Sequence, residues 1–332
     1  MVYDVHAHCI PPQFRAWLES KGADVGLQLL DAGRGVCVRF NDRYTTAPLR
    51  DALGDMEARL GAMDRMGINT QLLAGWVDLS GYDLEPASGV TYARAHNDAL
   101  VEHADQERER FLTLATVPLQ DPAAAADELG RAMGELGMVG VQIATTVGSD
   151  WLDQRPLDAF WEAAAELGAL IVLHPMAPLT GVDLDRYFMS NTIGRPAETT
   201  IALAGLIFSG VFDRHPELRL CVVHGGGFAP FQVGRMNRSY QAKPEASAKH
   251  ISRLPSDYLS ELYFDTVVHD PNVLRFLIES FGAEQILLGT DYPFEMGDDD
   301  PVGLVDSVTG VTPAEREAIL FGNVERLLGV GQ

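Results

Sequence analysis

Four histidines and one aspartate have the residue types and the spacing from which a catalytic centre can be built. His6 and His8 are separated by one residue, so in a β-strand both side chains point to the same face. His174, His224 and Asp291 each follow a run of mainly aliphatic residues, where a buried strand would end. Three imidazoles and a carboxylate suit a borderline divalent cation and leave one coordination position for water. We therefore predict a metal site made of His6, His8, His174 and Asp291.

The fifth residue of this set, His224, is predicted to be the acid/base group beside the metal. A divalent metal lowers the pKa of its bound water to about 7 and so supplies a nucleophile near neutral pH. One histidine at a strand end is often a cap or a core residue, but five polar residues at strand ends favour a functional site. For the histidines on expected helices or loops we favour structural roles; these are His96, His103, His215, His250 and His269.

The elements that must position these residues are short β-branched runs that alternate with longer helical stretches, as in repeated βα units. The predicted strands are Val2–His8, Thr70–Leu73, Phe111–Ala115, Val139–Ile143, Leu170–His174, Arg219–His224, Leu262–Asp265 and Gln285–Thr290. Eight such strands favour an α/β fold of the closed (β/α)₈ TIM-barrel type over an open sheet. The carboxyl ends of barrel strands meet at one face, so the five polar residues are expected to converge there.

Helices and two long loops complete the predicted barrel. The predicted helices are Asp55–Met66, Pro122–Gly137, Pro156–Leu167 and Pro313–Leu328. Residues 9–54 form a small insertion after the first strand, with alternating segments such as Gly35–Phe40 that suit a hairpin. Pro175–Leu203 form a second excursion, and long loops of this kind build the site at the carboxyl face. We predict one domain over residues 1–332.

Composition restricts the partners and the location of the protein. The formal net charge is −22, which repels nucleic-acid phosphates. The three cysteines are widely spaced, so they indicate neither a disulfide framework nor a cysteine metal site. No signal-peptide pattern and no apolar run long enough to span a bilayer is present in the sequence. We expect a cytoplasmic enzyme that binds neither nucleic acid nor membrane.

Motifs spread over nearly the whole chain resemble the amidohydrolase superfamily, and within it the decarboxylase branch of the 2-amino-3-carboxymuconate-6-semialdehyde decarboxylases. The matching segments are Asp4–His8, Gly140–Ile143, Pro196–Thr200, His224–Gly227 and Leu288–Phe294. The resemblance implies a (β/α)₈ barrel with one divalent metal, zinc or else manganese, and non-oxidative loss of carbon dioxide without an organic cofactor. A single ion is also favoured because Gln142–Thr146, at the end of the fourth strand, offers no Lys, Cys or Glu to bridge a second one.

The resemblance also implies roles for residues around the metal. His224 would activate the metal-bound water and pass its proton to the substrate, with Asp291 as its catalytic neighbour. Arg235 matches an arginine that reaches into the neighbouring subunit to hold a substrate carboxylate, which implies a homodimer; a surface salt bridge is the alternative. The other carboxylate-binding arginine of the family maps to Ala47, with Arg43 and Arg50 as nearby candidates.

Two further positions are predicted to bear on the substrate. Phe294 would line the pocket as it does in the family, whereas Met176 replaces a tryptophan. We therefore predict a carboxy-lyase, a carbon–carbon lyase that acts on a small unsaturated or aromatic acid resembling 2-amino-3-carboxymuconate-6-semialdehyde or a hydroxybenzoate. The alternative on the same barrel is a hydrolase or hydratase for a lactone, an amide or a double bond. A barrel that binds metal without catalysis is a third possibility.

Overall fold

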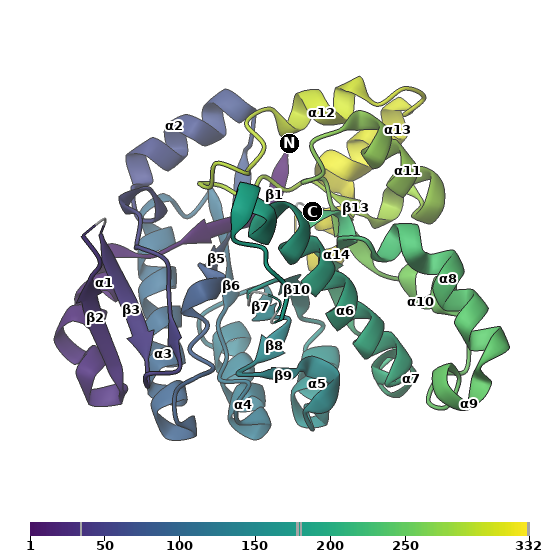
Figure 1. Cartoon of the computed structure of the whole chain (residues 1–332). Helices are drawn as coiled ribbons and strands as arrows, with labels where there is room; N and C mark the ends of the chain where they lie inside the picture. The colour runs from purple at the N-terminus through teal and green to yellow at the C-terminus, as the bar shows by residue number, and fades with distance from the viewer. Residues whose placement is uncertain (34, 177–178, 180, 331–332) are drawn as a thin grey trace.

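The computed structural model describes residues 1–33, 35–176, 179 and 181–330. Within these residues eight parallel strands form one sheet, in the order β1-β5-β6-β7-β10-β11-β12-β13 (Figure 1). The strands are β1 (Tyr3–Cys9), β5 (Thr70–Gly75), β6 (Phe111–Ala115), β7 (Gly140–Ala144), β10 (Leu170–His174), β11 (Arg219–Val222), β12 (Tyr263–Asp265) and β13 (Ile286–Leu287). The predicted (β/α)₈ barrel is confirmed.

The barrel closes between its first and last strands. The Val5 N–H donates to the Leu288 carbonyl at 2.9 Å, and the His8 N–H donates to the Tyr292 carbonyl at 2.8 Å. The Asp4 carboxylate reinforces this seam, because it accepts both the backbone N–H and the hydroxyl of Thr290. Regular pairing of the last strand ends at Leu287, earlier than predicted, because its partner β12 itself ends at Asp265, which pairs with Leu287.

Apolar side chains from the strands explain why the sheet is buried on both faces. One cluster joins residues of six strands to the last helix: it contains Tyr3, Val5, Leu72, Ala74, Leu114, Leu170, Val172, Cys221, Val223, Leu287, Val324 and Leu327. Residues of so many strands can meet in one cluster only inside a barrel, which is therefore a packed core and not a pore. A larger cluster packs the outer face of the strands against the helices.

Helices surround the barrel, and those predicted at Asp55–Met66, Pro122–Gly137 and Pro156–Leu167 are present with similar bounds. The helices are α2 (Met56–Met66), α3 (Pro86–Ala104), α4 (Pro122–Gly134), α5 (Asp158–Glu166), α6 (Arg195–Phe208), α7 (Val211–Arg214), α8 (Ala229–Ala242), α9 (Pro244–Ser247), α10 (Pro255–Leu259), α11 (Pro271–Phe281) and α12 (Pro301–Ser307). The tail is helical over the predicted range, Pro313–Leu328, with a π-helical turn within it. It consists of α13 (Pro313–Glu317), a π-helical turn and α14 (Asn323–Leu328), where the buried Asn323 amide donates to the carbonyls of Ala283 and Ile286. None of the described helices is both long and apolar enough to cross a membrane.

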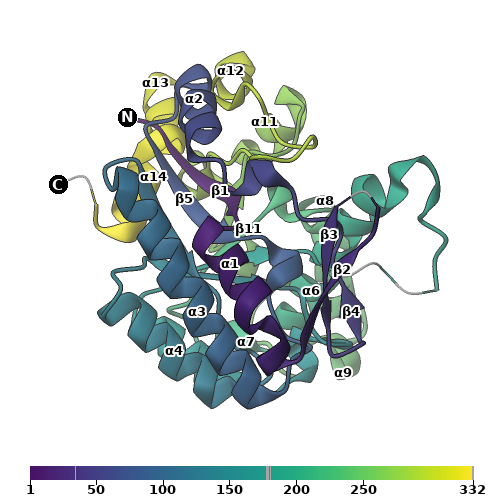
Figure 2. The ribbon, with the colours of Figure 1, turned by 90° about the vertical axis from the view of Figure 1, so that its left-hand side faces the viewer.

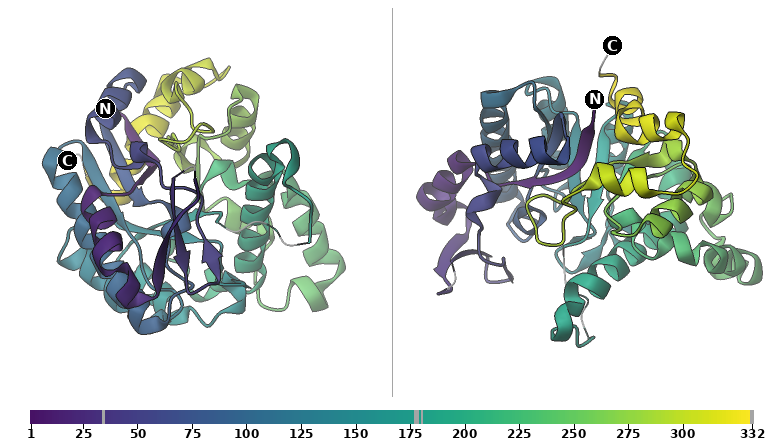
Figure 3. Two further views of the ribbon diagram at one scale, coloured as in Figure 1. Left: turned by 60° about the vertical axis from the view of Figure 1, so that its left-hand side comes forward. Right: turned by 90° about the horizontal axis from the view of Figure 1, so that it is seen from above.

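The insertion after β1 forms a small layer of its own beside the barrel. It contains α1 (Pro12–Lys21) and an antiparallel sheet of β2 (Leu27–Asp31), β3 (Val36–Phe40) and β4 (Tyr44–Thr45), so the predicted hairpin strand is present. Figure 2 shows α1 and this sheet next to α3. Figure 3 shows the insertion, in purple, on the opposite side of the barrel from α8–α10, in green. That the chain folds as one domain stays a prediction.

Candidate metal centre and pocket

Four of the predicted residues meet at the carboxyl end of the barrel. His6 and His8 come from β1, His174 ends β10, and Asp291 follows β13. One nitrogen or oxygen atom of each lies within 4.8 Å of those of the other three, and all four residues are buried. Residues far apart in the sequence therefore make one compact set of metal donors.

The spacing of the donor atoms fits a metal ion. His6 Nε2 lies 3.2 Å from His8 Nε2, and Asp291 Oδ1 lies 3.1 Å from His8 Nε2 and 3.5 Å from His6 Nε2. Two ligands that hold Zn²⁺ tetrahedrally, each about 2.1 Å from the ion, are about 3.4 Å apart. The donor set therefore has the spacing that one ion requires.

The opposite nitrogen of each ligand histidine meets an acceptor that orients the ring. His6 Nδ1 lies 2.7 Å from Asp265 Oδ2, and His174 Nδ1 lies 2.7 Å from the Pro175 carbonyl oxygen. His8 Nδ1 lies 3.4 Å from the Gly75 carbonyl oxygen. An acceptor at Nδ1 holds the proton there and leaves the Nε2 lone pair for a metal. All three rings therefore present Nε2 to the centre.

Asp265 is a member of the site for which the sequence analysis assigned no role. It ends β12 and is fully buried, and besides its contact with His6 it accepts the Gly225 backbone N–H at 2.9 Å. The signal was present in the sequence, since Asp265 is a polar residue at a predicted strand end like the others. Asp265 thus links the metal ligand His6 to the turn that carries His224.

We expect Asp265→Asn to weaken metal binding by about 10–100-fold, the usual effect of losing a charged partner of a ligand histidine. The amide keeps the shape of the side chain but loses the charge that supports Nδ1–H of His6. Competition between the protein and a chelator measures the change in affinity. Asp306→Asn, in an exposed pair with Arg316, is the matched control. Equal metal affinity in Asp265→Asn and wild type would contradict the role of Asp265.

The electrostatics around Asp291 and His174 favour the protonation states in which these two residues bind a metal. Burial raises the pKa of Asp291, but His6, His224 and His8 outweigh it and hold that pKa well below its usual range. Burial and the neighbouring histidines lower the pKa of His174 well below its usual value. A carboxylate that is ionised and an imidazole that is neutral are the forms that coordinate cations.

His224 lies beside the four donors. Its ring centroid is 5.2 Å from those of His6 and His174, and its Nε2 is 3.7 Å from Asp291 Oδ2. Its Nδ1 is buried without a hydrogen-bond partner among the described residues. His224 has φ +55° and Asp291 has φ +58°, values that are uncommon outside glycine and that concentrate at functional sites.

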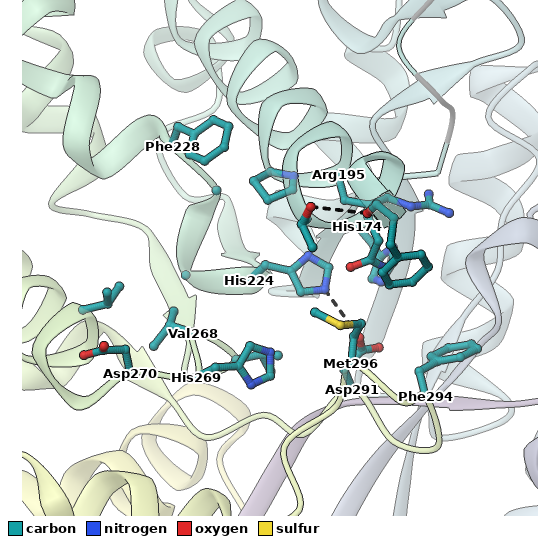
Figure 4. A pocket seen from close by; sticks show the side chains of 18 of the residues that line it. His174, Arg195, His224, Phe228, Val268, His269, Asp270, Asp291, Phe294 and Met296 are labelled. Carbon is teal, nitrogen blue, oxygen red and sulfur yellow. Dashed lines mark hydrogen bonds and ion pairs between the residues drawn. The ribbon is translucent and has the colours of Figure 1, made fainter. Parts of the chain in front are cut away.

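The glycines after His224 form a tight turn. Gly225, Gly226 and Gly227 all have positive φ, and a Cβ atom on Gly227 would lie 2.3 Å from the Pro196 carbonyl oxygen. Glycine is therefore required for the chain to turn here against the start of α6. The turn places the His224 side chain at the base of the pocket (Figure 4).

A pocket of about 930 Å³ opens above the cluster and exposes His174, His224 and Asp291 at its base. Its walls are mainly aromatic and aliphatic; the aromatic residues are Trp76, Phe188, Phe228, Phe231, Phe276 and Phe294. Polar residues on the wall include Arg50, Arg195 and His269. A pocket of this size, in which polar groups stand between aromatic walls, suits a small planar molecule.

Two of the predicted substrate-binding residues line this pocket and two do not. Phe294 and Arg50 line it, with the Arg50 guanidinium 5.4 Å from the Phe294 ring centroid. Met176 is buried near Ser80 and is not part of the described lining. Arg235 is exposed on α8 and also lies outside the described lining.

The pocket also contains residues for which the sequence predicted a different role or no role. Arg195 and Asp78 lie on the wall, although neither was singled out in the sequence. His269, for which we expected a structural role, also lines the pocket and has φ +58°. His96, by contrast, is buried in α3 with its ring 4.6 Å from that of Phe14, as a core residue would be.

Known proteins resemble this chain over most of its length. The family model described as Amidohydrolase matches residues 3–330. A 2-amino-3-carboxymuconate-6-semialdehyde decarboxylase from Dictyostelium discoideum is 32% identical over 276 residues, which are 83% of this chain and 77% of the relative. A gamma-resorcylate decarboxylase from Rhizobium sp. is 30% identical over 289 residues, 82% of this chain and 86% of the relative.

A solved structure shares the fold over the full length. It is a dihydroxybenzoic acid decarboxylase from Polaromonas sp. with bound manganese and the inhibitor 2-nitroresorcinol. The TM-score is 0.80 at 25% identity, and the match covers 100% of this chain and 97% of that one. The barrel therefore has a counterpart of known structure, and that counterpart contains manganese.

Proposed function

The chain belongs to the amidohydrolase family, and on that premise we propose that it is a metal-dependent, non-oxidative decarboxylase, a carboxy-lyase for a small unsaturated or aromatic acid. One observation carries the proposal: three histidines and an aspartate lie preorganised for an ion at the base of an aromatic pocket. The relatives support the reaction, because those that match over most of their length are decarboxylases.

His6, His8, His174 and Asp291 would hold the metal, which supplies a Lewis acid that stabilises negative charge on the substrate. His224 would deliver a proton to the carbon that carries the carboxylate. The bond to the carboxyl carbon then breaks, carbon dioxide leaves, and its electron pair restores the unsaturation of the substrate. Asp291, 3.7 Å from His224 Nε2, stabilises the protonated imidazole before the transfer.

The walls of the pocket would orient the substrate above this centre. The Phe294 ring lies 5.2 Å from the His8 ring and can stack on a planar acid. Arg50 is a candidate for the substrate carboxylate, although Glu295 accepts from its Nη1 at 2.5 Å. An acid bound against the aromatic lining would displace water, which would strengthen each charge interaction in the pocket.

Release of carbon dioxide from a panel of acids tests the function. The panel contains hydroxybenzoates and 2-amino-3-carboxymuconate-6-semialdehyde, and the assay uses metal-loaded protein, metal-free protein and His224→Ala. We expect release from at least one acid, dependent on both metal and His224. Water-addition or ring-opening products in place of carbon dioxide would instead indicate the hydrolase or hydratase alternative.

We propose zinc as the resident ion, since three nitrogens and one oxygen suit it, with manganese as the other candidate. The manganese in the dihydroxybenzoic acid decarboxylase supports the second choice. Metal analysis of purified protein distinguishes the two. A cytoplasmic location is also part of the proposal, and the three cysteines, all unpaired, are compatible with it.

We also propose a homodimer in which Arg235 of each subunit enters the partner's site. Arg235 follows Phe231 by four residues on α8, so the two share a helix face. The Phe231 side chain lies at the pocket and is 79% exposed. A second copy that covers this face would bury Phe231 and bring its own Arg235 to the pocket.

Mixing two inactive variants tests this arrangement. In a heterodimer of His224→Ala and Arg235→Ala subunits, one of the two sites has both residues intact. Random exchange of subunits makes about half of the dimers mixed. Since one of the two sites in each mixed dimer is intact, roughly one quarter of all sites should recover. Each variant alone is the control. Full activity of Arg235→Ala, or no recovery after exchange has been demonstrated, would exclude the shared site.

A further inference from the structure

We infer that Arg195, held in place by Asp78 and the Pro175 carbonyl, binds a second acidic group of the substrate, such as a carboxylate or an ionised phenol. This inference rests on the proposed decarboxylase function and specifies its substrate class. The substrate would carry one acidic group at the metal centre and another at the wall of the pocket.

The position of Arg195 relative to the metal centre is set by one peptide group. Arg195 begins α6 and lines the pocket, and its Nη1 donates to the Pro175 carbonyl at 2.9 Å. The same carbonyl accepts from Nδ1 of the metal ligand His174 at 2.7 Å. One imidazole ring and two hydrogen bonds thus separate the guanidinium from the ion's position. Figure 4 shows Arg195 next to His174, on the far side of the pocket from Asp270.

The guanidinium is held firmly but retains donors for a ligand. Asp78, with 7% of its side chain exposed, places Oδ1 3.7 Å from Nη2 of Arg195. The guanidinium has five N–H donors in a planar fork, and the Pro175 carbonyl takes one of them. The side chain is 29% exposed, and part of that exposure faces the pocket. A fork that is already oriented binds a carboxylate through two parallel hydrogen bonds at little entropic cost.

The surroundings favour Arg195 over Arg50 as the group that attracts an anion. Arg50 pairs with Glu295 at 2.5 Å, and both side chains are well exposed, so the pair is neutral and screened by solvent. The partner of Arg195 is more distant, and burial raises the pKa of the Asp78 carboxyl. Ala47 also lines the pocket, and its small side chain leaves space for a substituent. In a chain of net charge −22, such a local cation is needed to attract an anion.

Direct binding tests the inference without any need for turnover. Isothermal titration calorimetry of the metal-loaded protein compares benzoate with its diacids isophthalate and terephthalate. We expect at least one diacid to bind wild type at least about tenfold more tightly than benzoate, as one added charged hydrogen-bonded pair would give. Arg195→Met should remove this advantage, and Arg195→Lys should restore part of it.

An arginine far from the pocket provides the matched control for Arg195→Met. Arg108 is 77% exposed, pairs with Asp105 and precedes β6, so Arg108→Met removes one positive charge at the amino end of the barrel. This variant should keep the full preference for the diacid. A wild type that binds the diacids no better than benzoate would overturn the inference, as would an Arg195→Met protein of normal fold and metal content that keeps the preference. Binding does not depend on carbon dioxide release, so failure here is distinguishable from failure of the proposed function.

Discussion

Replacing His224 with alanine is expected to lower kcat by about 10²–10⁴-fold, the usual contribution of a positioned acid/base group, while the protein keeps its metal. The reason is geometric. His224 lies next to the cluster, yet its Nε2 is 3.7 Å from Asp291 Oδ2 and it is not one of the four donors that lie together. Removing its ring therefore takes away the proton donor and leaves the donor set complete. Carbon dioxide release and metal analysis of the same sample measure the two properties together.

A second histidine provides the control for this variant. His250 is exposed and lies outside the described lining of the pocket, so His250→Ala should retain full activity and metal. If His224→Ala loses metal as completely as a variant of one of the four donors, His224 is a ligand and not the acid/base group. Unchanged kcat with normal metal content would remove His224 from the reaction altogether.

Asp291→Ala is expected to lose the metal and with it all measurable activity. Asp291 contributes the one carboxylate among the four donors, and its Oδ1 lies within 3.5 Å of Nε2 of both His6 and His8. Because it is a direct ligand, its loss should weaken binding by more than about 100-fold, the upper limit for losing the partner of a ligand. Competition with a chelator, followed by an activity assay in excess metal, measures both effects.

The backbone at Asp291 requires a second variant. Because Asp291 has φ +58°, an alanine at this position is strained whatever its effect on the metal, whereas asparagine tolerates this backbone angle. Asp291→Asn should therefore keep the stability of wild type to heat and still bind metal poorly. An Asp291→Asn protein that binds metal as tightly as wild type would show that the carboxylate is not a ligand.

The barrel and its metal donors were predictable because they depend on local patterns. A buried parallel strand is a run of aliphatic residues, and a polar residue directly after it must lie at the carboxyl end of the barrel. His6, His8, His174 and Asp291 satisfy this rule, and the structure brings them together. Asp265 satisfies it as well, since it ends a predicted strand, so the same rule could have identified it.

The wall of the pocket was harder to predict because it comes from loops and helix starts. Arg195 begins a helix, and its guanidinium reaches the site through the Pro175 carbonyl, which lies 20 positions earlier in the chain. Such an arrangement depends on contacts between residues that are not neighbours in the sequence, such as that of Met176 N–H with Glu198, and leaves no periodic signal. The same holds for His269, which reaches the pocket through a left-handed backbone angle.

The seam between β1 and β13 has a consequence for how the protein is made. The hydroxyl of Thr290 lies 3.4 Å from the His6 carbonyl, although the two residues are 284 positions apart. A nascent chain therefore carries His6 and His8 long before it gains Asp291, the last of the four ligands along the sequence. Contacts of such long range form late in folding. Tight metal binding should thus report a finished barrel, and ribosome-bound chains that stop before β13 should be unable to retain the ion.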